Sequence, residues 1–171
     1  MDKVIFFNIT DVLNSEDYTI GRHGLVGTDV AIVRGDIASY DIDINTVGIL
    51  NCIVEATGAE LVLFSDWRRD GTAEDNFDIN EVLCGCGLKK PFSDIVPVLD
   101  EEIKGEELEE WFAEHPDFTG QYVILDTAVE GLNIDRYSSF IRINPKHGLT
   151  ADDSYKAIRK LNGKEDSIWN F

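Results

Sequence analysis

The stretch Val4-Ile5-Phe6-Phe7-Asn8-Ile9-Thr10-Asp11-Val12-Leu13-Asn14 lies close to the start of the chain and decides the fold. It opens with apolar residues of β-branched and aromatic types and then turns polar, which is typical of a buried strand in a parallel sheet that runs out into a loop. In open α/β sheets, ligands bind beyond the carboxyl ends of the strands. The stretch therefore predicts a central strand with a functional site at its tip, where Asn8, Thr10 and Asp11 lie.

Further apolar stretches of strand type alternate with helical patterns along the rest of the chain. The strands are predicted at 60–64, 95–98, 121–125 and 140–143, and the helices at 44–54, at 78–87, from 104 and from 150. This alternation predicts an α/β fold with a central parallel sheet of about five strands flanked by helices. A length of 171 residues suits one domain over 1–171.

The segment 15–43 differs in character from its surroundings. It contains several glycines between short apolar runs, such as Val30 to Val33. Turn residues between short β-prone pieces predict a small β-rich flap rather than a helix.

Composition bounds the class of protein. The hydrophobic fraction of 43% and the charged fraction of 28% are typical of a soluble globular domain. No apolar run is long enough to span a bilayer, and the start of the chain lacks a signal pattern, so a cytoplasmic protein is predicted. Cys52, Cys84 and Cys86 are an odd number for a disulfide framework, and we expect reduced, mostly buried thiols.

The net charge of −18 bears on partners. Such a charge disfavours long-range attraction to nucleic acid and to anionic membranes. A solubilising acidic surface is the simple interpretation. A mimic of nucleic acid is the alternative, although the acidic residues are dispersed along the chain.

The first stretch resembles the first motif of the haloacid dehalogenase (HAD) superfamily of phosphohydrolases and phosphotransferases. In that motif a hydrophobic strand ends in Asp-x-Asp, where the first Asp attacks phosphorus and the second handles protons. Here Asn8 stands in the place of the nucleophile and Thr10 in the place of the acid/base residue.

Later motifs of the same superfamily have counterparts at three other predicted element ends. The resemblance makes Ser65 the donor to the transferring phosphoryl group, Lys104 the residue that neutralises its charge, and Asp126 a ligand of Mg²⁺. It also implies that Asn8, Thr10 and Glu130 complete the magnesium site. For Glu130, a solvated surface acid is the alternative interpretation.

Three local patterns resemble one branch of the superfamily, the HAD domain of Swiss Army knife RNA repair proteins. They are Ser65-Asp66-Trp67-Arg68, Lys104-Gly105-Glu106-Glu107-Leu108 (Arg-Gly-x-Glu-Ile in the branch) and the Gly148-Leu149-Thr150 entry into the last helix. The resemblance implies a Rossmann-like HAD fold in which 15–43 is a small cap. It also makes Arg68 and Asp11 candidates for substrate binding, although Arg68 could instead form a salt bridge with a nearby acid.

The function implied by this lineage is Mg²⁺-dependent hydrolysis of phosphate monoesters. A neutral amide at position 8 is a poor nucleophile, so covalent catalysis is expected to be lost or nearly lost. Asn8 could be an engineered substitution that traps substrate, or it could mark a natural pseudophosphatase that binds a phosphorylated ligand or a protein. Asp11 could also serve as a displaced nucleophile.

The partners expected from the sequence follow from the lineage and the charge together. The resemblance to RNA repair proteins raises nucleic acid ends as substrates. The net charge of −18 favours a small phosphorylated molecule or a nucleotide instead, and no membrane partner is expected.

Overall fold

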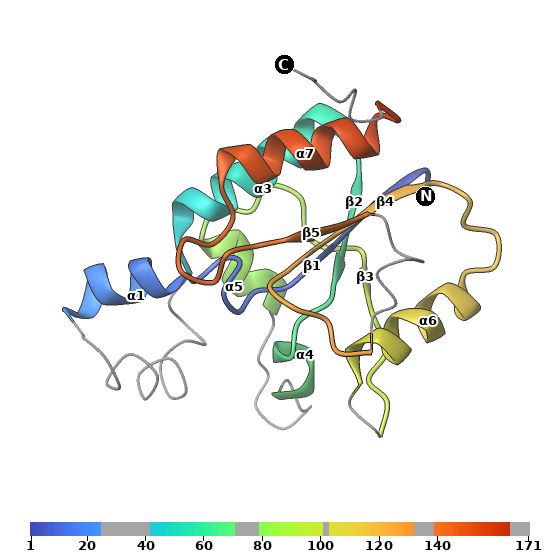
Figure 1. Cartoon of the computed structure of the whole chain (residues 1–171), viewed down its shortest axis with the longest axis horizontal. Coiled ribbons are helices and arrows are strands. Elements are labelled where there is room, and N and C mark those ends of the chain that lie inside the picture. Colours follow the sequence, from blue (N-terminus) through green and yellow to red (C-terminus); the bar gives the residue numbers. More distant parts are fainter. Residues whose placement is uncertain (25–41, 71–78, 101–102, 132–138, 165–171) are drawn as a thin grey trace, which may run out of the picture.

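A five-stranded parallel sheet forms the centre of the protein in a computed structural model that describes residues 1–24, 42–70, 79–100, 103–131 and 139–164 (Figure 1). The strand order is β3-β2-β1-β4-β5. The strands are β1 (Lys3–Phe7), β2 (Glu60–Leu63), β3 (Asp94–Ile95), β4 (Gln121–Asp126) and β5 (Phe140–Arg142). The predicted α/β class and the central position of the first strand are confirmed.

The buried sequence of β1 reflects coverage of the sheet on both faces. Val4 to Phe7 are fully buried. Ile5 and Phe7 belong to one apolar cluster, whereas Val4 and Phe6 belong to the cluster on the other face. A parallel strand packed on both faces is apolar at every position, because neither set of alternating side chains meets water.

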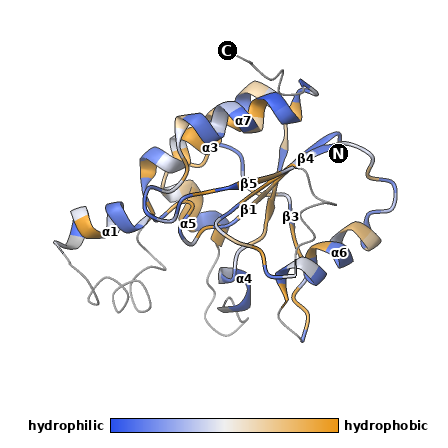
Figure 2. Cartoon of the chain, in the orientation of Figure 1, coloured by the Kyte–Doolittle hydropathy of each residue, from blue (hydrophilic) through white to orange (hydrophobic). Residues whose placement is uncertain are grey.

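Helices supply the two outer layers (Figure 1). The described helices are α1 (Glu16–His23), α3 (Ile44–Thr57), α4 (Trp67–Asp70), α5 (Ile79–Gly85), α6 (Lys104–Glu114) and α7 (Ala151–Leu161). Residues of α3, α5 and α7 pack with the Ile5 and Phe7 side of the sheet, and α6 packs with the Val4 and Phe6 side. Figure 2 shows the apolar strands at the centre, between helices of mixed character.

Local capping explains where the long helices begin and end. Asp43 caps the start of α3 by accepting from the N–H of Asn45, and Gly58 ends the helix at φ 70°. Thr150 and Asp153 form a capping box at the start of α7, as the sequence predicted for Thr150. These caps satisfy backbone groups that the helix itself leaves unpaired.

The structure corrects two predictions. The described part of 15–43 contains the helix Glu16–His23, capped by Ser15 and ended by Gly24, rather than β structure; residues 25–41 of the predicted cap lie outside the described residues. The thiols of Cys52 and Cys84 are exposed, so the prediction of mostly buried cysteines is wrong for these two.

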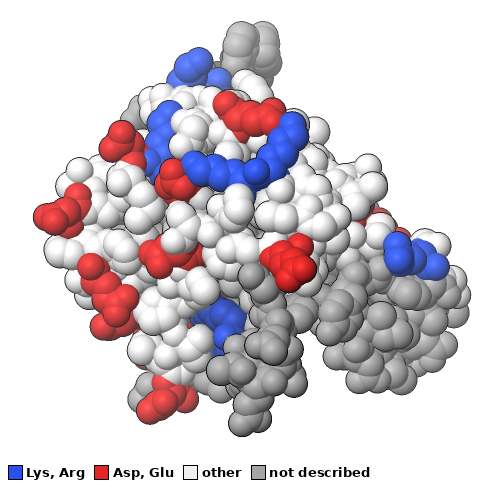
Figure 3. All heavy atoms as spheres, turned by 180° about the vertical axis from the view of Figure 1, so that it is seen from behind, with Lys and Arg blue, Asp and Glu red and all other residues white. Residues whose placement is uncertain are grey.

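On the face turned away from the view of Figure 1, acidic side chains are spread over the surface (Figure 3). None of the helices in the described part of the chain has the length and apolar character needed to cross a membrane.

Gly148 packs against the loop that follows β1. The N–H of Leu149 donates to the carbonyl oxygen of Val12 at 2.9 Å, which brings the two loops together. Gly148 has φ 70°, and a Cβ there would lie 2.9 Å from the Val12 oxygen and 3.1 Å from Ser15 Cβ. A larger residue at this position therefore meets both backbone strain and a steric clash.

We expect Gly148→Ala to lower the free energy of unfolding by about 2–4 kcal/mol, measured by urea denaturation. Gly58→Ala is the matched control, because Gly58 has φ 70° and nothing lies within 4 Å of an added Cβ. The control is expected to lose only the cost of the left-handed backbone, roughly 1–2 kcal/mol. Equal losses in the two variants would show that the approach to Val12 contributes nothing.

Candidate active site

Four buried polar side chains lie at the carboxyl edge of the sheet. Asn8 follows β1, Ser65 lies just after β2, Asp126 ends β4, and Lys104 begins α6. Their exposed fractions are 5%, 0%, 1% and 9% respectively. The register places Phe7 beside Leu63 and Leu125, so the residues that follow these positions emerge at the same level of the sheet.

The Asp126 carboxylate is held by donors on both of its oxygens. Oδ1 accepts from Asn8 Nδ2 at 2.9 Å and from the Thr127 N–H at 2.7 Å. Oδ2 accepts from Lys104 Nζ at 2.5 Å. A buried carboxylate needs such compensation, because burial without partners costs several kcal/mol or more.

The orientation of the Asn8 amide follows from its two neighbours. Its Oδ1 accepts from the Ile9 N–H at 2.8 Å, while its Nδ2 faces Asp126. In a flipped amide, Nδ2 would face the Ile9 N–H, donor against donor, and Oδ1 would face the Asp126 oxygen, acceptor against acceptor. The hydrogen-bond network therefore selects one orientation.

Lys104 lies over the ring of Phe64, the residue that precedes Ser65. Lys104 Nζ lies 4.6 Å from the centroid of that ring, an arrangement that favours a cation over the aromatic face. The N–H of Trp67 lies 3.4 Å from Ser65 Oγ, and the Ser65 carbonyl oxygen accepts from Arg68 Nη1 at 2.7 Å. A hydroxyl, an ammonium and a paired carboxylate thus occupy one buried edge of the sheet.

Comparison with known proteins assigns the chain to a family. Residues 4–154 match the model of a family described as the HAD domain in Swiss Army Knife RNA repair proteins. The chain belongs to this HAD family. The comparisons with curated proteins and with solved structures gave no match.

The resemblance to HAD domains predicted the four buried residues described above as motif positions. The structure joins Asn8 and Lys104 to Asp126 by hydrogen bonds and places Ser65 just beyond the end of the neighbouring strand β2. Their roles in binding or catalysis remain predictions. HAD domains generally use Mg²⁺, and the described residues contain no group of three or more His, Cys, Asp or Glu that could hold a metal ion.

The structure also describes three other predicted site residues. Thr10 forms an isolated bridge with Asn14, and the backbone of Asp11 has φ 66° with its N–H donating to Asn14 Oδ1 at 2.8 Å. This left-handed residue turns the chain, so Asp11 does not continue the line of β1. Glu130 is exposed, and its backbone oxygen accepts from the Gly105 N–H at 2.7 Å.

Sequence reasoning missed a buried ionic network beside the HAD site. Glu107 is fully buried on α6 and forms salt bridges with Arg68 and with Arg69, the latter at 2.6 Å. The Leu99 N–H also donates to Glu107 at 3.1 Å. Burial lowers the pKa of Arg68, and the charge of Glu107 opposes that shift. Of the two interpretations of Arg68, the salt bridge to a nearby acid is the one the structure shows.

The signal for this network was present in the two local patterns of the HAD branch. Arg68 belongs to the Ser65-Asp66-Trp67-Arg68 pattern, and Glu107 stands at the Glu position of the pattern that begins at Lys104. The network therefore joins α4, which follows Ser65, to α6, which begins at Lys104.

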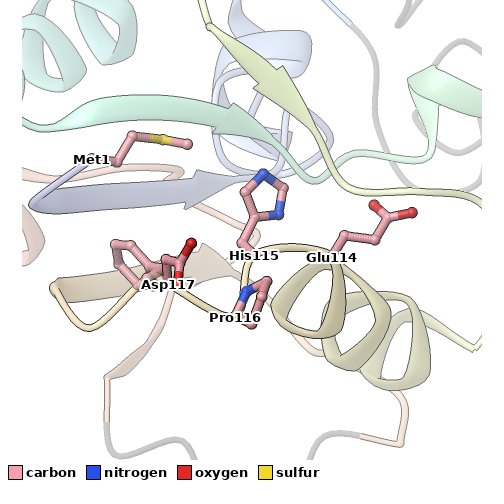
Figure 4. Close-up of a pocket in the computed structure, with 6 residues that line it drawn as sticks. Met1, Glu114, His115, Pro116 and Asp117 are labelled. Carbon is pink, nitrogen blue, oxygen red and sulfur yellow. The ribbon is translucent and has the colours of Figure 1, made fainter.

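A surface hollow lies at the far end of α6 from Lys104. Its volume is about 240 Å³, and Met1, Glu114, His115, Pro116 and Asp117 contribute to its lining (Figure 4). His115 stacks on Trp111, with Nδ1 2.8 Å from the Trp111 carbonyl oxygen and Nε2 3.2 Å from Asp94. These contacts are packing contacts at the opposite end of the helix, so the hollow is separate from the HAD site.

Proposed function

We propose that this HAD domain binds the phosphoryl group of a small phosphorylated molecule or nucleotide without hydrolysing it efficiently. The observation that carries the proposal is the Asn8 amide, which stands in the position of the HAD nucleophile and donates to Asp126. The family supports a phosphohydrolase lineage, and an amide cannot form the phospho-enzyme intermediate that a carboxylate forms.

The other side chains of the site support phosphoryl binding. Phosphoryl transfer depends mainly on positioning and charge neutralisation. Ser65 supplies a hydroxyl and Lys104 supplies a positive charge at the same buried edge. These two features would hold a phosphate even where the covalent step is absent.

The alternatives are active hydrolysis and protein binding. Mg²⁺-dependent hydrolysis by this chain would need a nucleophile other than Asn8, and Asp11 is the candidate named by the sequence.

A nucleic acid end remains a candidate ligand because of the family description, whereas the net charge of −18 favours a small ligand. A cytoplasmic location belongs to the same proposal and is supported by the three free thiols.

The test is the affinity for inorganic phosphate measured by calorimetry, with Mg²⁺ present. We expect Lys104→Ala and Ser65→Ala each to weaken binding about tenfold or more, since hydrogen bonds to charged groups contribute about 1.5–3 kcal/mol. Circular dichroism would establish that both variants are folded.

Lys89→Ala is the matched control for the loss of one positive charge. The Lys89 side chain is 69% exposed and pairs with Glu55, away from the site. The control is expected to bind phosphate as the unaltered chain does. Unchanged affinity in both Ser65→Ala and Lys104→Ala would contradict the site assignment.

A further inference from the structure

The HAD site of this chain has a reduced set of ligands for a metal ion. Magnesium prefers oxygen ligands and is usually held by one or two carboxylates together with waters. At the corresponding positions this chain has the amide of Asn8, the hydroxyl of Thr10 and the single carboxylate of Asp126. Compared with the Asp-x-Asp motif, two negative charges are missing.

The Asn8 amide does not present an acceptor toward Asp126. Its Nδ2 points to Asp126 Oδ1 at 2.9 Å, and its oxygen is occupied by the Ile9 N–H at 2.8 Å. A cation placed between the two side chains would meet amide hydrogens on one side. Reversing the amide would break both hydrogen bonds, so the present orientation disfavours the binding of a metal ion between Asn8 and Asp126.

Lys104 already neutralises the one carboxylate. Its ammonium donates to Asp126 Oδ2 at 2.5 Å, and the side chain is only 11% exposed. A divalent cation on the same carboxylate would lie close to this ammonium and would be repelled by it. The residues present therefore do not fit Mg²⁺.

The Lys104 ammonium favours an anion at this site rather than a second cation. Lys104 pairs with Asp126, Arg68 and Arg69 pair with Glu107, and Arg69 also pairs with Asp66. Lys104 has three N–H donors, and Asp126 takes one of them. Lys104 is therefore the group at this site that favours a negative ligand.

We propose that this site binds phosphate without a divalent cation, with Lys104 providing the positive charge that HAD domains generally obtain from Mg²⁺. This inference rests on the proposed function and specifies its metal requirement. The ligand is a phosphate or phosphate monoester dianion. It is recognised by Lys104 and Ser65, and Asn8 keeps Asp126 in place.

The experiment is a calorimetric titration of the unaltered chain with inorganic phosphate at constant ionic strength, once with a chelator and once with excess Mg²⁺. We expect the two dissociation constants to agree within about twofold, because no binding contact depends on the metal. Phosphate affinity that is at least about tenfold higher with Mg²⁺ would overturn the inference. Absence of phosphate binding under both conditions would contradict the proposed function and this inference with it.

Asn8→Asp is the matched variant, because it restores one acidic ligand and removes the amide hydrogens. In this variant we expect phosphate to bind about tenfold more weakly in chelator than with Mg²⁺, since the added charge repels the anion until a cation neutralises it. The same small metal dependence in the variant and in the unaltered chain would overturn the role given to Asn8.

Discussion

Glu107→Ala is expected to lower the free energy of unfolding by about 3–5 kcal/mol, the usual cost of breaking a buried ion pair by removing one partner. Glu107 is fully buried, and the Arg68 side chain that it holds is 2% exposed. Removal of the carboxylate leaves Arg68 and Arg69 without their shared counter-charge and leaves the Leu99 N–H without its acceptor. Urea denaturation measures the loss.

Glu106→Ala is the control for this change. Glu106 precedes Glu107 on the same helix and is exposed, so the same substitution there should change stability by no more than about 0.5 kcal/mol. Glu107→Gln keeps the shape of the side chain and removes its charge, and it should also destabilise the fold. A Glu107→Ala protein as stable as Glu106→Ala would show that the network does not tie α4 to α6.

Asn8→Asp is expected to destabilise the metal-free protein by about 1–3 kcal/mol near neutral pH. The new carboxyl group would lie beside Asp126, where Asn8 Nδ2 now lies 2.9 Å from Oδ1. Two carboxylates at this distance repel each other, so the pKa of the new carboxyl is raised above its value in the unfolded chain. Chemical denaturation in chelator measures the effect.

The sign of the pH dependence follows from the raised pKa. Between the pKa of the new carboxyl in the unfolded chain and its raised pKa in the folded chain, the folded variant holds a proton that the unfolded chain has released. The stability of the variant relative to the unaltered chain therefore falls as pH rises through this range. Excess Mg²⁺ should recover much of the lost stability by neutralising the pair.

Asn144→Asp is the control for an added negative charge. Asn144 is exposed, and an oxygen at that position can still accept from the Lys146 N–H. Its stability should depend little on Mg²⁺. If the stability of Asn8→Asp were also independent of Mg²⁺ and followed the same pH profile as Asn144→Asp, the account of the Asn8–Asp126 contact would be wrong.

Much of the fold could be predicted from the sequence because its signals are local. The apolar run of β1, the helical spacing of α3 ended by Gly58, and the Thr150 cap of α7 each reside in a few neighbouring residues. The third strand is shorter than predicted and lies at the sheet edge, and Pro97 lacks the N–H that would extend its pairing. Helix α1 differs from the prediction because the Ser15 cap and the acidic first turn favour a helix in a segment whose glycines are typical of turns.

The site was predictable only in part. Asn8, Ser65, Lys104 and Asp126 each stand at an element end, so a parallel sheet brings them together. The pairing of Glu107 with Arg69 and Arg68 joins residues 38 and 39 positions apart, and helical spacing alone does not reveal which acid a buried arginine contacts. The orientation of the Asn8 amide likewise depends on two neighbours that the sequence does not place.

Hydrolysis of an aryl phosphate with Mg²⁺, measured for this chain beside its Asn8→Asp variant, tests the central claim most directly. The amide at position 8 cannot attack phosphorus, so we expect no turnover above background from the unaltered chain and measurable Mg²⁺-dependent turnover from the variant. Turnover by the unaltered chain at the rate of the variant would contradict the claim that this HAD site binds phosphoryl groups with its nucleophile replaced.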